Sequence, residues 1–132
     1  MIFDRLFARR RAPPPLRGAP AVRRQKTYSA QTGHVYQYYY EGHRPGQRGD
    51  EYVFQVSSDR KSAFALTVLL PAASIEAWQR DHGRALTPTE QYAAVKMALF
   101  QAFDERAELG PAAEVEIAPG AIRALLESLE ID

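Results

Sequence analysis

The chain has 132 residues, of which 45% are hydrophobic and 11% aromatic, enough for one domain with a single hydrophobic core. It contains no cysteine, which excludes disulfide frameworks, thiol nucleophiles and Cys-based zinc sites and favours a reducing compartment such as the cytoplasm. The net charge of +1 conceals an asymmetry, because residues 1–26 hold eight Lys or Arg against one acidic residue (+7), whereas residues 27–132 hold nine against fifteen (−6).

Residues 1–26 are predicted to form a disordered Pro/Arg-rich basic tail, followed by one α+β domain over residues 27–132. From Pro13 onward, prolines and like charges oppose both helix formation and burial. The first residues lack the apolar core of a secretory signal peptide, but their Arg-rich, acid-poor composition leaves organellar import open. The tail could contact an acidic protein, a nucleic acid or an anionic membrane surface through Arg9, Arg10, Arg11, Arg23 and Arg24.

Three strands are predicted in succession, at residues 34–41, 51–57 and 63–70. The first two alternate tyrosines and apolar residues with polar ones, and the third is almost entirely apolar, as expected of a central strand. The segment 42–50 between the first two is rich in Gly, Pro and polar residues and is interpreted as a flexible hairpin loop. Short connections favour an antiparallel meander.

Helices are predicted at residues 74–83, 87–106 and 121–131, with a possible fourth short strand at 113–117. The first should begin at Ser74 as N-cap and end at Gly83. The second has the clearest start, because Thr87 and Glu90 form a capping box around Pro88. Its apolar residues recur at helical spacing and should cover the second and third strands: Tyr92, Val95, Leu99 and Phe103.

The fold class is therefore α+β: a three-stranded antiparallel meander, extended by a possible fourth strand, covered by two to three helices. An exposed strand edge or the last helix could also support a homo-oligomer.

No catalytic or metal-binding set can be assembled from the sequence, and no cofactor is predicted. The histidines His34, His43 and His82 lack the spacing that places two imidazoles on one helix face. The loop residues His43, Arg44 and Arg48 lie among glycines, but the loop leads into a strand and not into a helix whose amides could hold a phosphate. An anion site is the minor interpretation of that loop.

The tyrosines of the first strand, Tyr36, Tyr38 and Tyr40, project to one side. They could form a ligand surface, since exposed aromatics stack on nucleic-acid bases. Packing beneath a helix is the favoured alternative, because the stripe has no interleaved Arg or Lys and the acidic domain repels phosphate.

Three functions follow as hypotheses. The leading one is a non-catalytic binding or adaptor module that engages a protein partner through an open sheet face or edge, with the basic tail serving acidic partners. The second is a nucleic-acid-binding protein that uses the arginines and the tyrosine stripe. The third is a small enzyme with its site between the sheet and the helix at 87–106, built from Tyr38, His34, His82 or Glu90.

Overall fold

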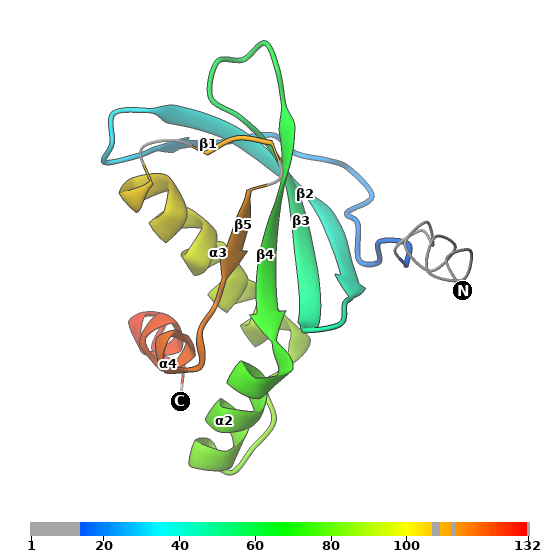
Figure 1. Ribbon diagram of the computed structural model, residues 1–132, viewed down its shortest axis with the longest axis vertical. Coiled ribbons are helices and arrows are strands. Elements are labelled where there is room, and N and C mark those ends of the chain that lie inside the picture. Colours follow the sequence, from blue (N-terminus) through cyan, green and yellow to red (C-terminus); the bar gives the residue numbers. More distant parts are fainter. Residues whose placement is uncertain (1–13, 107–108, 112, 132) are drawn as a thin grey trace, which may run out of the picture.

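The computed structural model describes residues 14–106, 109–111 and 113–131. The chain forms one five-stranded sheet in the order β1-β2-β3-β4-β5 and three helices (Figure 1). The strands are β1 Lys26–Ser29, β2 Val35–Pro45, β3 Gly49–Ser57, β4 Phe64–Pro71 and β5 Glu114–Glu116. The helices are α2 Ala72–His82, α3 Pro88–Glu105 and α4 Pro119–Ser128.

The α+β class and the antiparallel meander are confirmed, but the sheet is larger and mixed. Strands β1 to β4 pair as antiparallel neighbours, whereas β5 pairs in parallel with β4. The strand predicted at 113–117 is therefore present. The additional strand, β1, falls at the boundary of the predicted tail and is held to α3, because the Tyr28 hydroxyl donates to Asp104 Oδ2 at 2.7 Å.

The predicted loop at 42–50 is mostly strand. Only residues 46–48 separate β2 from β3, and the pairing shifts register between Tyr40 and Gly42. Strand pairing continues past this bulge from Gly42 to Pro45, and Arg44 Nε also donates to Glu51 Oε1 across the two strands at 2.9 Å. Turn-forming residues in this segment thus mark a bulge and a tight turn and not a flexible loop.

The N-terminal segment lies against the sheet edge from residue 14 onward. Arg17 forms an antiparallel bridge with His43, in which Arg17 N donates to His43 O at 2.7 Å and His43 N to Arg17 O at 2.8 Å. Gly42 permits this approach, since a Cβ there would lie 2.6 Å from Arg17 O. This bridge joins part of the predicted tail to the domain, although residues 14–25 are exposed apart from the half-buried Leu16; Arg9, Arg10 and Arg11 lie outside the described residues.

The helices lie on one side of the sheet (Figure 1). Helix α2 begins two residues before the predicted start, and Ser74 is not its cap; the buried Ser74 hydroxyl instead donates to Ile117 O at 2.8 Å. Gly83 ends this helix in the left-handed conformation, as predicted. Within the described chain, no helix has the length and apolar character needed to cross a bilayer.

The capping box of α3 is present as predicted. Glu90 N donates to Thr87 Oγ1 at 3.1 Å, and Thr87 N donates to Glu90 Oε1 at 2.9 Å. We expect Thr87→Ala to lower the free energy of unfolding by about 0.5–2 kcal/mol, because it leaves an amide of the first turn without its acceptor.

Urea titration followed by circular dichroism measures this loss. The matched control is Thr89→Ala on the same exposed turn, which should change stability by less than about 0.5 kcal/mol. Equal losses in the two variants would contradict a specific capping role for Thr87.

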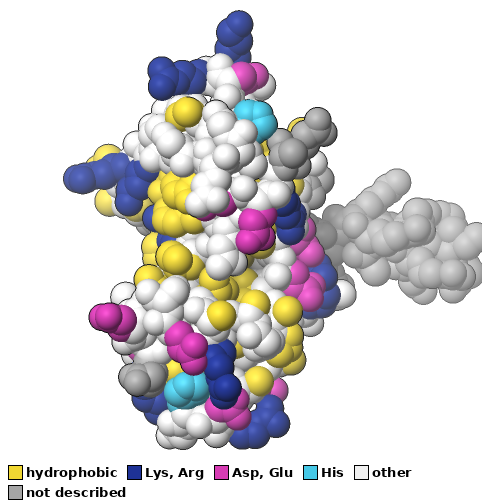
Figure 2. Space-filling view, turned by 90° about the vertical axis from the view of Figure 1, so that its left-hand side faces the viewer, with side chains coloured by type: hydrophobic (Ala, Val, Ile, Leu, Met, Phe, Trp, Pro, Cys, Tyr) yellow, Lys and Arg dark blue, Asp and Glu magenta, His cyan; other side chains and the backbone are white. Residues whose placement is uncertain are grey.

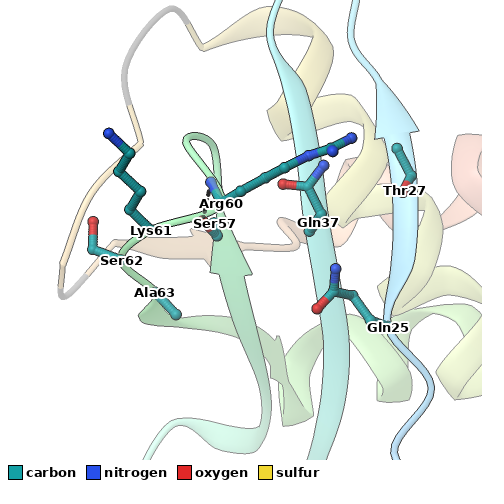
Figure 3. A pocket seen from close by; sticks show the side chains of 8 residues that line it. All are labelled: Gln25, Thr27, Gln37, Ser57, Arg60, Lys61, Ser62 and Ala63. Atoms are coloured by element: carbon teal, nitrogen blue, oxygen red, sulfur yellow. Dashed lines mark hydrogen bonds between the residues drawn. The ribbon is translucent and has the colours of Figure 1, made fainter.

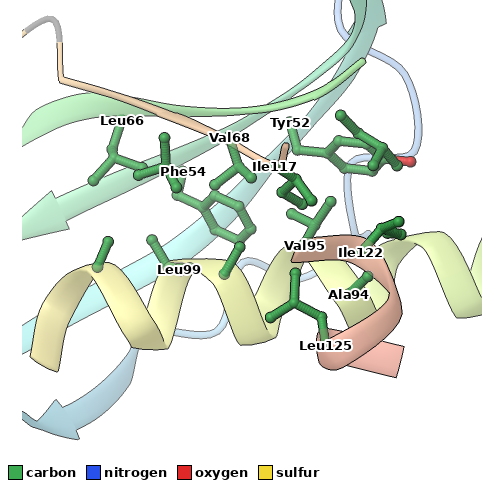
Figure 4. Packing of buried hydrophobic residues seen from close by; sticks show 14 of the residues in the cluster. Tyr52, Phe54, Leu66, Val68, Ala94, Val95, Leu99, Ile117, Ile122 and Leu125 are labelled. Carbon is green, nitrogen blue, oxygen red and sulfur yellow. The ribbon is translucent and has the colours of Figure 1, made fainter. Parts of the chain in front are cut away.

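Helix α3 covers the centre of the sheet (Figure 4). Val95, Leu99 and Phe103 are fully buried, whereas Tyr92 is only half-buried. The buried face also includes Ala94, Ala98 and Ala102, whose small side chains let neighbouring elements approach the helix. The prediction that this helix covers the sheet is thus confirmed. Its buried face, however, is turned away from Tyr92 and towards these alanines.

Candidate functional site

The sheet face opposite the helices has a polar pocket where β1, β2 and the β3–β4 hairpin meet. Side chains alternate along a strand, so Gln37 points away from the helices, while its neighbours Tyr36 and Tyr38 point towards them. Gln37 pairs in register with Thr27 of β1 and Ser57 of β3. These three residues form a polar row across three strands.

The hairpin connection adds a wall to this row and encloses a cavity of about 410 Å³ (Figure 3). The Arg60 side chain extends across the pocket towards Gln37 in this view. Of the described residues that line the pocket, two are basic and none is acidic: Gln25, Thr27, Gln37, Ser57, Arg60, Lys61, Ser62 and Ala63.

Gln37 distinguishes this pocket from an ordinary surface hollow. Its side chain is 5% exposed, and neither Nε2 nor Oε1 has a hydrogen-bond partner among the described residues. Leaving a buried polar group unsatisfied costs about 1–3 kcal/mol. A ligand that offers one donor and one acceptor would satisfy this amide once the side chains that cover both atoms in the structure move aside.

Asp59 organises the hairpin loop that carries the basic side chains. Its Oδ1 accepts from Lys61 N at 2.8 Å and from Ser62 N at 2.9 Å. These bonds, of which the one from the Ser62 amide has the largest effect, lower the pKa of Asp59 to about 2. The carboxylate is therefore charged and hydrogen-bonded within the loop.

Arg60 adopts the left-handed conformation, with φ of 63°, and its amide donates to Ser57 Oγ at 3.0 Å. This backbone region usually favours Gly or Asn, so an arginine there is a candidate for a functional role. Figure 2 shows basic side chains at the tip of this hairpin, at the top of the molecule.

The residues predicted for the 42–50 anion site are engaged within the protein. Arg44 pairs with Glu51, and Arg48 pairs with Glu114 at 2.8 Å and Glu116 at 3.1 Å. The His43 ring stacks on Tyr52 with centroids 5.3 Å apart. Arg44 and Arg48 are thus paired with carboxylates of the same chain, and His43 packs on Tyr52. These side chains therefore do not form a common open site.

The tyrosine stripe lies beneath α3. Tyr36 and Tyr38 are 1% and 5% exposed, and Tyr36 stacks on Phe103 with centroids 4.3 Å apart. Tyr40 is half-buried and its hydroxyl lies 2.9 Å from His43 Nδ1; burial raises the pKa of Tyr40. The stripe is part of the core, as the favoured interpretation predicted, and Tyr36 and Tyr38 do not form an open ligand surface.

Of the five tail arginines predicted as contacts, Arg23 and Arg24 are described, and both lie near β2. Arg23 pairs with Glu41 at 3.3 Å and lies over the Tyr39 ring at 5.8 Å. Arg24 lines a second cavity, next to α3.

The residues proposed for an enzyme site make their contacts in different places. His34 contacts Tyr36, His82 Nδ1 donates to Trp78 O at 2.9 Å, and Glu90 belongs to the capping box and pairs with Arg84. Among the described residues, no group of three or more His, Cys, Asp or Glu could hold a metal ion.

Neither Gln37 nor the hairpin 57–62 is among the site residues predicted from the sequence. The alternation of β2 already implied that Gln37 faces away from the tyrosines, and the loop SSDRKS has no glycine to take a left-handed position. Neither pattern reveals that the amide is buried without a partner, since this depends on how β1 and the hairpin enclose it.

Comparison of the chain with protein-family models, curated proteins and solved structures finds no match.

Proposed function

We propose that the protein is a non-catalytic binding module that takes a short acidic segment of a protein partner in the pocket around Gln37. The observation that carries this proposal is the buried Gln37 amide, which lacks a partner for both its donor and its acceptor within the described chain. In this proposal the partner segment contacts the helix-free sheet face, and Arg60 and Lys61 line the same pocket as Gln37.

The pocket's chemistry matches that of a peptide with a carboxylate side chain. A primary amide presents its carbonyl acceptor and one of its two N–H donors side by side, so it can pair reciprocally with the C=O and N–H of one residue in an extended chain, which point to the same side. Arg60 offers a planar fork of donors suited to a carboxylate, and Lys61 adds a second positive charge.

A short acidic segment fits the charge distribution better than a nucleic acid. The domain from residue 27 onward has a net charge of −6, which repels a long chain of phosphates. Salt screens charges beyond about 8–10 Å, so one or two carboxylates respond mainly to the two basic residues at the pocket. The buried Tyr36 and Tyr38 also offer no stacking surface for bases.

The probe is a pool of randomised hexapeptides with a fixed central glutamate, compared with a pool that has a fixed central lysine. The side-chain NH₂ signals of Gln37 can be followed directly in two-dimensional NMR spectra of the nitrogen-15-labelled full chain. We expect the glutamate pool to shift them at micromolar to millimolar concentration and the lysine pool to leave them in place.

We expect Arg60→Gln to weaken the binding of the glutamate pool by about ten- to hundredfold, because it removes a charged hydrogen bond of about 1.5–3 kcal/mol. The matched control is Arg80→Gln on the exposed face of α2, which removes the same charge elsewhere and should leave affinity unchanged. Equal weakening in the two variants, equal binding of both pools, or tighter binding of a thymidine decanucleotide than of the glutamate pool would contradict the proposal.

A further inference from the structure

We propose that a second pocket, between residues 20–26 and α3, binds a small aromatic carboxylate, with the Lys96 ammonium as its anion contact. This pocket is separate from the one around Gln37, and the two share no lining residue. It encloses about 220 Å³ and is lined by Pro20, Val22, Arg24, Lys26, Tyr38, Tyr39, Tyr40, Tyr92 and Lys96.

The charges at this pocket have one sign. Arg24, Lys26 and Lys96 line it, and none of its described lining residues is acidic. Arg24 and Lys26 belong to the basic segment 1–26, and together with Lys96 of α3 they concentrate positive charge at this pocket. An anion is therefore the ligand that this pocket favours.

Lys96 is held by aromatic rings and not by a carboxylate. Its Nζ lies 5.3 Å from the ring centroids of Tyr38 and Phe100 and 5.7 Å from that of Tyr92. No hydrogen bond or ion pair joins it to another described residue. Burial, together with the nearby Lys26, lowers the pKa of Lys96, so a bound carboxylate would stabilise its charged form.

The size and lining of the pocket favour a ligand in which the carboxylate is attached to a flat apolar ring. A cavity of about 150 Å³ accommodates benzene, so this pocket has room for one ring and a carboxylate. Tyrosines, Pro20 and Val22 supply the apolar part of its lining. Val22 is 66% exposed, which is unusual for a valine on this protein, and an aromatic ligand would cover it.

The test is a titration of the full chain with benzoate, with benzylamine as the probe of opposite charge and benzyl alcohol as the neutral one. Binding is followed by calorimetry and by the NMR signals of Lys96. We expect benzoate to bind at least tenfold more tightly than either of the other two, and to raise the pKa of Lys96 as read from its side-chain carbon signals.

Lys96→Met keeps the length and apolar stem of the side chain and removes the charge, so we expect it to weaken benzoate binding by at least tenfold. The matched control is Arg80→Met on the exposed face of α2, outside both pockets, which should leave benzoate binding unchanged. Lys26→Met provides a second variant at the pocket mouth, with a smaller loss expected, in case the first does not fold.

Three results would overturn the inference: benzylamine binding as tightly as benzoate, benzoate affinity unchanged in Lys96→Met, or no benzoate binding up to about 10 mM. Because the hexapeptide titration uses a different pocket and probe, either proposal can fail while the other stands.

Discussion

Replacing Leu99 with alanine is expected to lower the free energy of unfolding by about 2–5 kcal/mol. Leu99 is fully buried on α3, and Figure 4 places it beneath Phe54 and Leu66 of the sheet. The truncation removes apolar contacts and leaves a cavity that neighbouring helices and strands can close only in part.

Urea unfolding followed by circular dichroism gives the loss directly. Gln101→Ala is the control, because Gln101 is exposed on the same helix and its replacement should change stability by less than about 0.5 kcal/mol. A loss below about 1 kcal/mol for Leu99→Ala would contradict the role of α3 as the cover of the core.

Replacing Gln37 with methionine is expected to have the opposite effect on stability, raising the free energy of unfolding by about 1–3 kcal/mol. Methionine has a similar length and flexibility, and it removes a donor and an acceptor that are buried without partners. The same change should abolish binding of the glutamate peptide pool. Stability gained together with binding lost is the behaviour expected where a protein keeps a costly polar group for function.

The control for this change is Gln55→Met, since Gln55 lies on the same sheet face of neighbouring β3 but is half-buried and has no buried amide atom without a partner. It should alter stability by less than about 0.5 kcal/mol and leave peptide binding intact. If Gln37→Met instead destabilises the protein, then water or another group already satisfies the amide, and the binding proposal loses its main support.

The local signals in the sequence predicted the helices well. The capping box at Thr87 and the apolar spacing that follows involve residues close along the chain, so the start of α3 and most of its buried face could be recognised. Strand pairing was harder, because β5 joins β4 in parallel across 47 positions, between Thr67 and Glu114. No local pattern states which strand a three-residue segment will join.

The candidate site was harder to predict from the sequence than the fold, because it also depends on contacts between residues far apart along the chain. The sequence drew attention to Arg44 and Arg48, but their acidic partners are set by tertiary structure, with Glu114 lying 66 positions after Arg48. Similarly, basic composition placed residues 14–25 in the tail, whereas Gly42 allows Arg17 to bridge to β2. Nothing in the sequence around Gln37 indicates a site, since the feature that distinguishes this residue is the burial of its amide in the folded structure.

The single tryptophan, Trp78, provides the molecule with an internal optical reporter. It is 2% exposed in α2, its indole stacks on His82 with ring centroids 4.0 Å apart, and it lines neither proposed pocket. Its fluorescence should therefore follow the loss of helix packing and remain insensitive to peptide or benzoate. One sample can then be read in two spectral channels, with tyrosine emission reporting ligand at Tyr38, Tyr40 and Tyr92 and tryptophan emission reporting whether the fold is intact.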